Sequence, residues 1–231
     1  EDSLEGSRTK PINRLSKAYT KTSFPMSIKA AFAKSHILKP KSLIKANAEA
    51  PINTLELYLD YACPFCLKIF SRWTEGGLFK DEFLSEHSLQ IRFNNVPQPW
   101  HLASIPVHNV SLAVARYQPD SFWDYSLQLF KDSKEKWDDN FNGQTPAQFN
   151  ETLAKHAHEH TGIDYDVVLN YLSDKDEGKH RIPDLKYFVR YHRTVGAHVT
   201  PTVAINGIII SSIESSTDLE TVVKLIKQHT A

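Results

Sequence analysis

The chain has 231 residues, enough for one substantial domain. Hydrophobic residues make up 41% of it and charged residues 23%, a balance typical of a globular protein. No apolar run approaches the roughly 18 residues that a membrane-spanning helix needs, so we expect no transmembrane segment. With only two cysteines, the chain cannot be a disulfide-scaffolded secreted domain. The formal net charge is zero, and we expect no nucleic-acid partner.

Charge is distributed unevenly along the chain. No acidic residue lies between Glu5 and Glu49, a stretch with ten Lys and Arg residues, whereas residues 49–231 carry 24 acidic residues against 17 Lys and Arg. We therefore expect residues 1–48 to be a basic tail whose removal leaves stability unchanged, and residues 49–231 to fold. The tail fits an organellar targeting segment, a flexible extension, or vector-derived residues before Met26. It lacks the apolar core of a secretory signal, so we expect an intracellular protein, cytoplasmic or mitochondrial.

The first elements of the folded part are predicted to be a strand, a helix and a strand. Residues 54–60 alternate apolar and polar side chains, which predicts a strand. From Cys63 onward, apolar residues recur at helical spacing as far as Gly76. Residues 89–94 alternate again. A strand, a helix and a strand within about 40 residues indicate a βαβ unit with parallel strands.

A helical segment then interrupts the β pattern from about residue 98 to residue 195. Apolar residues recur there at helical spacing and nowhere alternate. Thr145 and Gln148 enclose Pro146 in the pattern of a capping box, which predicts a helix start. Gly196 is expected to close the last helix of the segment. We interpret residues 98–195 as a helical insertion.

β structure returns near the C-terminus. Residues 202–210 predict an antiparallel hairpin, because apolar stretches flank the turn pair Asn206-Gly207. Thr217 and Glu220 predict a capping box for one last helix. The complete order is βαβ, helical insertion and ββα, which predicts an α/β fold with a mixed sheet.

Both cysteines lie in the segment Cys63-Pro64-Phe65-Cys66, where the first strand gives way to the helix. At positions i and i+3 the two sulfurs lie on one helical face, within reach of one disulfide. Cys63 is placed at the helix N-terminus, where unpaired N–H groups and the helix dipole stabilise a thiolate and lower its pKa. Pro64 costs no helical hydrogen bond in the first turn. The motif predicts a redox pair with Cys63 as the nucleophile and Cys66 as the resolving cysteine.

Three competing interpretations of the cysteines stay open beside the redox pair. A zinc site would need two further ligands, and no other cysteine can supply them. The second is an iron–sulfur cluster shared between two chains, and the third is a pair of inert core thiols. A separate group, His156, His158 and His160, invites a metal interpretation because His156 and His160 share a helical face. No carboxylate lies beside them in the pattern of a metal site, so we expect a solvated helix end and no metal.

The element order, with Cys-Pro-Phe-Cys after the first strand, resembles the thioredoxin fold. That superfamily has a cis-proline before its third core strand, facing the cysteines, and Thr200-Pro201 matches this position. The resemblance implies that Pro201 is the cis-proline and that Thr200 and Pro201 contact the substrate. Cys66 and Pro201 are 135 positions apart, and a helical insertion between the two halves of the fold resembles the DsbA-like branch. The resemblance covers about residues 50–229.

The sequence departs from that branch at two points. Pro64-Phe65 replaces the Pro-His of strongly oxidising bacterial members and is closer to the Pro-Tyr of dithiol glutaredoxins. The family also tends to place a buried acid six residues before the first cysteine. Leu57 occupies this position, while Glu56 and Asp60 lie at other offsets, so a proton-relay role for either acid stays open.

The resemblance implies a thiol–disulfide oxidoreductase that exchanges disulfides with protein substrates or with glutathione, in a direction that the sequence leaves open. It implies no cofactor beyond the redox-active disulfide, with glutathione as a candidate co-substrate. Two further functions belong to different classes. A glutathione transferase or isomerase of the kappa type shares the inserted-helix fold but usually has serine as its nucleophile. A non-enzymatic binding module would keep the fold without redox cycling.

Overall fold

The computed structural model describes residues 28–42, 52–133 and 137–230. Its strands are β1 (Ile37–Leu38), β2 (Asn53–Leu59), β3 (Leu89–Asn95), β4 (Thr202–Ile205) and β5 (Ile208–Ile209). Its α-helices are α1 (Ala33–His36), α3 (Pro64–Glu75), α4 (Asp81–Glu86), α5 (Ser104–Tyr117), α6 (Phe122–Ser133), α7 (Trp137–Asn142), α8 (Pro146–Thr161), α9 (Tyr165–Leu172), α10 (Arg181–Thr194) and α11 (Leu219–Thr230). Two 3-10 turns, η1 (Ala30–Phe32) and η2 (Pro119–Ser121), complete the described elements. Among these helices, none is long and apolar enough to cross a bilayer.

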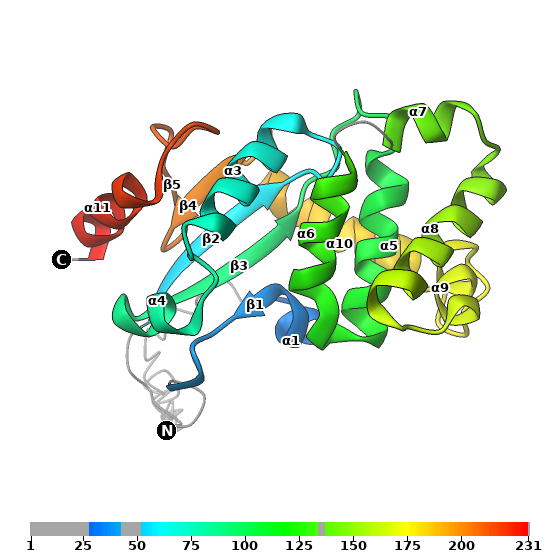
Figure 1. The fold of residues 1–231 in the computed structure, drawn as a ribbon, viewed down its shortest axis with the longest axis horizontal. Helices are drawn as coiled ribbons and strands as arrows, with labels where there is room; N and C mark the ends of the chain where they lie inside the picture. Colours follow the sequence, from blue (N-terminus) through cyan, green and yellow to red (C-terminus); the bar gives the residue numbers. More distant parts are fainter. Residues whose placement is uncertain (1–27, 43–51, 134–136, 231) are drawn as a thin grey trace, which may run out of the picture.

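The five strands form one mixed sheet in the order β1-β3-β2-β4-β5 (Figure 1). Strands β2 and β3 are parallel, as the predicted βαβ unit requires, and β4 pairs antiparallel with β2. The hairpin between β4 and β5 turns at Asn206 and Gly207, whose φ angles of 50° and 82° suit a two-residue hairpin turn. The predicted α/β fold with a mixed sheet is confirmed.

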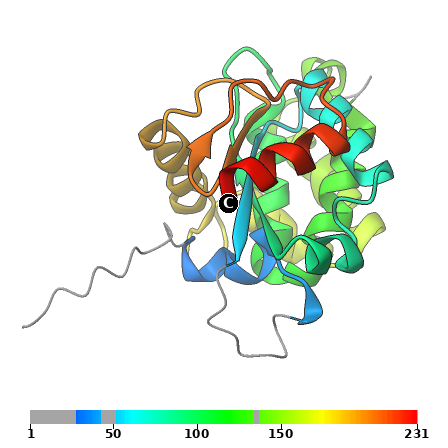
Figure 2. The same ribbon diagram turned by 90° about the vertical axis from the view of Figure 1, so that its left-hand side faces the viewer.

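Helices cover both faces of the sheet, which buries its central strands on both sides. Figure 2 shows α10 on one side and α3 with α6 on the other. In β2, Leu57 belongs to the main core with α3, whereas Tyr58 points to the opposite face and stacks on Tyr191 of α10. Glu56 is also buried and accepts a hydrogen bond from the Tyr58 hydroxyl. The polar positions of this strand therefore face a second helix layer and not solvent.

The helical insertion lies between β3 and β4 and comprises α5 to α10. The predicted capping box at the start of α8 is present, with both the Thr145 and the Gln148 hydrogen bonds formed. Gly196 follows α10 with a φ of 83°, a conformation that glycine adopts readily. These local sequence signals mark the helix ends correctly.

The start of α11 differs from the prediction. Asp218, and not Thr217, caps this helix, because its Oδ1 accepts a hydrogen bond from the Thr221 backbone at 2.7 Å. The Thr217 hydroxyl instead accepts from the Glu214 backbone N–H at 2.9 Å and stabilises the preceding turn. Aspartate and threonine are both good N-cap residues, so the choice depends on where the loop from β5 ends.

Residues 28–42 belong to the fold, which corrects the expected domain boundary at residue 49. Phe32 is fully buried, and the Lys29 ammonium lies 2.9 Å from the buried carboxylate of Asp184. Strand β1 pairs antiparallel with the edge of β3, with Ile37 opposite Arg92. The sequence prediction followed the basic charge of this stretch and overlooked its few apolar residues, which pack into the core. The targeting interpretation concerns residues 1–48, of which residues 1–27 and 43–48 lie outside the described residues.

Candidate active site

The Cys-Pro-Phe-Cys motif lies at the junction between β2 and α3. Cys63 is the N-cap residue of α3, and Pro64 is its first helical residue, where no backbone N–H is required. The Cys66 backbone N–H donates to the Cys63 carbonyl at 3.0 Å, which closes the first turn. Both cysteines are reduced and buried, with Cys63 4% exposed and Cys66 fully buried. The motif therefore places two thiols of one helical turn at the edge of the core.

The environment of Cys63 favours its thiolate. The Cys66 side chain, hydrogen-bonded to the Cys63 sulfur, makes the largest contribution and lowers the pKa of Cys63 to about 6. Burial opposes this effect, while the backbone N–H groups of Cys66 and Phe65 and the contact with Thr200 add to it. A thiol with this pKa is largely ionised at neutral pH, which makes Cys63 a competent nucleophile.

The environment of Cys66 favours its thiol. Complete burial raises the pKa of Cys66 well above its usual value, and the hydrogen bond and negative charge of Cys63 raise it further. The Asp60 backbone N–H donates to the Cys66 sulfur at 3.4 Å and partly offsets this effect. The predicted inequality of the two sulfurs is thus present in their surroundings.

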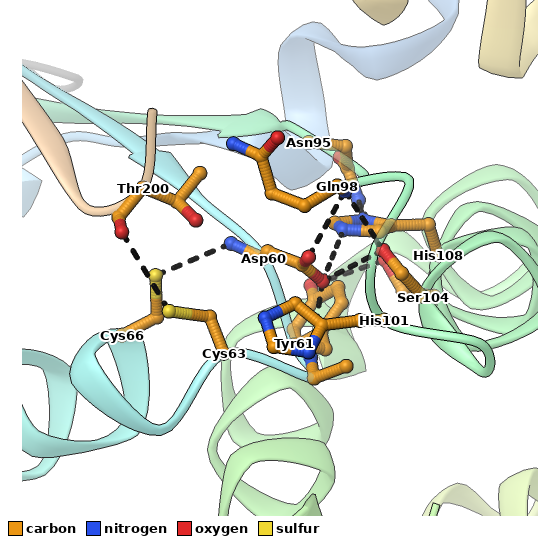
Figure 3. A network of polar contacts seen from close by, with 12 residues as sticks. Asp60, Tyr61, Cys63, Cys66, Asn95, Gln98, His101, Ser104, His108 and Thr200 are labelled. Carbon is orange, nitrogen blue, oxygen red and sulfur yellow. Dashed lines mark hydrogen bonds and ion pairs between the residues drawn. The ribbon is translucent and has the colours of Figure 1, made fainter. Parts of the chain in front are cut away.

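The Thr200-Pro201 loop lies directly against the cysteines. The peptide bond between Thr200 and Pro201 is cis, as the resemblance implied. The Thr200 carbonyl oxygen lies 3.6 Å from the Cys63 sulfur, although the two residues are 137 positions apart (Figure 3). The Gln98 side-chain amide donates to the His198 carbonyl at 3.1 Å and ties this loop to the segment after β3. The structure therefore brings together the two motifs that the sequence singled out.

Exposed apolar side chains lie within a few residues of these contacts. Phe65, between the cysteines, is 59% exposed, and Val199, beside Thr200, is 63% exposed. Trp100, two residues after Gln98, is 63% exposed. Phe65, Val199 and Trp100 are called the apolar rim below. Large apolar side chains are more often buried, and these three lie within two positions in sequence of Cys63, Thr200 or Gln98.

A buried carboxylate lies directly behind Cys66. Asp60 has no solvent exposure, and its Oδ1 accepts hydrogen bonds from the Ala62 N–H at 3.0 Å and the Ser104 hydroxyl at 2.8 Å. Its Oδ2 accepts from the Gln98 N–H at 3.0 Å, and His108 Nε2 lies 3.3 Å from Oδ1. Burial works against ionisation, yet these contacts, chiefly that with His108, lower the pKa of Asp60. Asp60 is therefore a charged anchor for the loops on both sides of the motif.

The polar network continues away from the cysteines through the core. His108 Nδ1 lies 2.8 Å from the Asn95 amide, and Asn95 Oδ1 lies 2.8 Å from His36 Nε2 in the N-terminal segment. A branch runs from Asn95 through Ser111 to the Tyr61 hydroxyl. Figure 3 shows the Asp60 carboxylate directed toward His108 and Ser104, and its backbone nitrogen toward Cys66. The network joins the motif, β3, α5 and α1 into one unit.

Of the two acids near the motif in sequence, Asp60 and not Glu56 lies beside Cys66. Leu57 lies in the main core among apolar neighbours, so no carboxylate replaces it there. Glu56 faces the α10 side of the sheet, where it pairs with Tyr58. Apart from the Ala62 N–H, the partners of the Asp60 carboxylate come from α5 and its preceding loop. The sequence does not single out His108 or Ser104, because only the fold brings them to Asp60.

The histidine group on α8 also differs from its expectation. His158 and His160 are exposed, but His156 is partly buried, with its side chain 14% exposed. Its Nε2 lies 2.9 Å from Asp132 Oδ2, a carboxylate supplied by α6. The expected solvated helix end therefore holds for His158 and His160 but is wrong for His156.

Comparison with known proteins supports the same fold. A family model described as Thioredoxin matches residues 40–228. No curated protein matches the sequence. Among solved structures, oxidised BdbD from Bacillus subtilis is 22% identical with a TM-score of 0.59, covering 84% of this chain and 92% of its own. DsbA from Chlamydia trachomatis is 18% identical with a TM-score of 0.58, covering 91% and 98%.

A third similar structure is described as a putative protein-disulfide isomerase from Pseudomonas syringae. It is 19% identical with a TM-score of 0.53, and the match covers 75% of this chain and 93% of that one. At these identities the solved structures show the fold alone. The family match, which spans residues 40–228, shows the family. The Cys63–Cys66 pair, the cis-proline facing it and the inserted helices all agree with this fold. The chain therefore belongs to the thioredoxin family and has the DsbA-like fold.

Proposed function

We propose that this protein is a thiol–disulfide oxidoreductase. The observation that carries the proposal is the placement of two thiols on one helical turn: Cys63 is the N-cap of α3, with its sulfur 3.6 Å from the Thr200 carbonyl oxygen, whereas Cys66 is fully buried. In these surroundings the pKa of Cys63 is lowered to about 6, and that of Cys66 is raised well above its usual value. A pair of inert core cysteines has no reason to differ in this direction. An attacking thiolate beside a protonated resolving thiol is the arrangement that disulfide exchange requires.

The reaction proceeds in two exchanges when the protein reduces a substrate. The Cys63 thiolate attacks one sulfur of the substrate disulfide, the substrate S–S bond breaks, and a mixed disulfide forms. Cys66 then loses its proton and attacks the Cys63 sulfur, which releases the second substrate sulfur. Two electrons pass to the substrate, whose two thiols take one proton from Cys66 and one from solvent. The same steps in reverse donate the Cys63–Cys66 disulfide to a dithiol substrate.

The substrate class that fits the site is an extended polypeptide segment with apolar side chains. The backbone at Thr200 and Pro201 lies beside Cys63 and can pair with an extended chain. The apolar rim offers hydrophobic surface on the segments that flank the nucleophile. Glutathione, as a small thiol, would use the same sulfur without needing the rim. The Thr200 and Pro201 backbone and the rim are therefore assigned to protein substrates.

The test is turnover of a protein disulfide, with insulin as substrate and reduced glutathione as reductant. The wild-type protein should accelerate reduction, and Cys63→Ser should abolish the acceleration because the attacking sulfur is gone. Cys66→Ser should accumulate a mixed disulfide, since attack still occurs and resolution does not. Wild-type protein that gives no acceleration, together with no adduct on Cys66→Ser, would leave a binding module in place of the enzyme.

A further inference from the structure

The insertion brings three metal-binding side chains together on α6 and α8, away from the cysteines in sequence. Asp132 of α6 and His156 and His160 of α8 each offer one ligand atom, and these atoms all lie within 4.8 Å of one another. Asp132 Oδ2 is 2.9 Å from His156 Nε2, and the two imidazole rings, one helical turn apart, have centroids 4.4 Å apart. Side-chain adjustments alone can therefore bring the three ligand atoms around one small ion.

His156 is held in one orientation by its neighbours. The Tyr125 hydroxyl lies 3.0 Å from His156 Nδ1, and the buried Trp137 ring packs edge-on against the imidazole with centroids 5.2 Å apart. This fixes Nε2 toward Asp132.

The Asp132 carboxylate is also held in one orientation by a neighbouring side chain. The Gln128 side-chain amide donates to its Oδ2 at 2.8 Å, which orients the carboxylate from one turn earlier on α6. An aspartate oxygen beside an imidazole nitrogen offers a bound cation one anionic and one neutral donor.

We propose that Asp132, His156 and His160 form a binding site for a divalent transition metal ion, with Zn²⁺ as the ion. Two imidazoles at positions i and i+4 with one carboxylate are a donor set that zinc accepts, and such a set leaves a fourth position for water. His160 is exposed, so this position opens to solvent. Nitrogen donors disfavour Mg²⁺ and Ca²⁺, which prefer oxygen ligands.

The hydrogen bonds of His156 can be satisfied both with and without a bound metal ion. Without metal, His156 donates its Nε2 hydrogen to Asp132 and accepts from the Tyr125 hydroxyl at Nδ1. When a metal takes Nε2, the hydrogen moves to Nδ1, and the same hydroxyl turns to accept it, because a hydroxyl can donate or accept. A metal-bound histidine usually donates its second N–H in this way. Binding would join α6 to α8 within the insertion.

The experiment must separate this site from the thiols, which also bind zinc. The full chain carrying Cys63→Ser and Cys66→Ser is titrated with Zn²⁺ by calorimetry, and with Mg²⁺ in parallel. Zn²⁺ should bind with one equivalent per chain and raise the melting temperature, while Mg²⁺ should do neither. His160→Ala should weaken Zn²⁺ binding at least tenfold, and Asp132→Asn should weaken it as well. His158→Ala, which alters an exposed histidine of the same helix outside the cluster, should retain the wild-type affinity.

His160→Ala keeps the test independent of folding, because His160 is exposed and its loss should leave the metal-free melting temperature unchanged. Absence of Zn²⁺ binding by the metal-free protein would overturn the proposal. Equal affinities for His160→Ala and the unaltered background would do the same, since binding would then lie elsewhere.

Discussion

His108 Nε2 lies 3.3 Å from Asp60 Oδ1, and neither side chain has any exposure to solvent. This contact places an imidazole nitrogen beside the buried carboxylate, which also accepts hydrogen bonds from Ala62, Gln98 and Ser104. It also ties the end of β2 to α5, so the loop that presents Cys63 is anchored from the insertion. The insertion therefore supports the loop of the Cys63–Cys66 motif.

Replacing Asp60 by Asn should destabilise the protein by about 3 kcal/mol, because a buried carboxylate that accepts three hydrogen bonds is replaced by an amide with a single acceptor oxygen. The pKa of Asp60 is lowered in the folded state, so its ionisation stabilises the fold above the unfolded value of 3.8. This contribution is lost as pH falls from 3.8 through the lower folded pKa. Urea unfolding at several pH values should therefore show a gap between wild type and Asp60→Asn that is constant above about pH 5 and closes in acid.

The matched control for this variant is Asp120→Asn. Asp120 pairs with Lys34 at the surface, with side chains 78% and 66% exposed. An exposed pair contributes only about 0–1 kcal/mol. Similar losses from the two variants would contradict the anchoring role of Asp60.

The N-terminal segment should contribute measurably to stability. Phe32 is fully buried and packs against Phe188 of α10, with ring centroids 5.1 Å apart. Phe32→Ala should therefore cost about 3–5 kcal/mol in chemical unfolding, the usual range for a buried phenylalanine. Leu102→Ala, at a 53% exposed position, should cost far less. A Phe32→Ala protein as stable as wild type would restore the expected boundary at residue 49.

The apolar rim should matter for protein substrates and not for a small disulfide. Phe65→Ala and Val199→Ala should each lower kcat/KM for insulin several-fold, because each removes exposed apolar surface from one of the segments that hold Cys63 and Thr200. Rates with oxidised glutathione should stay within about twofold. Ile208→Ala is the control, since Ile208 is 59% exposed on β5. Equal effects on both substrates would show that the rim acts on the cysteines and not on substrate binding.

The sequence predicted the parts of the site that depend on local patterns. Cys63, Pro64 and Cys66 follow from a strand-to-helix junction, and the place of Thr200-Pro201 follows from the hairpin after it. Each of these signals lies within about ten residues of sequence. The resemblance to the thioredoxin fold then predicted that the cysteines and the Thr200-Pro201 loop lie against each other. Helix ends marked by Thr145 and Gly196 were predictable for the same reason.

Contacts made only by the tertiary fold were not predictable in this way. Asp60 meets His108 from 48 positions away, and Asp132 meets His156 from 24 positions away. Neither pair leaves a local pattern. The N-terminal segment was missed because β1 has only two residues, too few for any alternation to show. Its basic composition led to the prediction of a tail, although the segment contains one phenylalanine that is buried in the fold.

The reduction potential of the pair should lie between the values of strong reductases and strong oxidases. A lower thiolate pKa stabilises the reduced form and makes the disulfide more oxidising. The Cys63 pKa of about 6 lies between the values of roughly 7 and roughly 3.5 that belong to thioredoxin and DsbA. Equilibration with glutathione buffers should therefore give a potential between about −270 and about −120 mV. A value outside this interval would contradict the prediction that the Cys63 pKa determines the reduction potential of this pair.

The central claim is that the two sulfurs have unequal roles, and the pH dependence of their alkylation measures it most directly. The reduced protein is pulsed with iodoacetamide between pH 4 and pH 10, and each cysteine is followed by peptide mass spectrometry. Cys63 should react with a midpoint near pH 6, while Cys66 should stay unreactive to above pH 9. A common midpoint near the free-thiol value of about 8.5 for both cysteines would contradict the account.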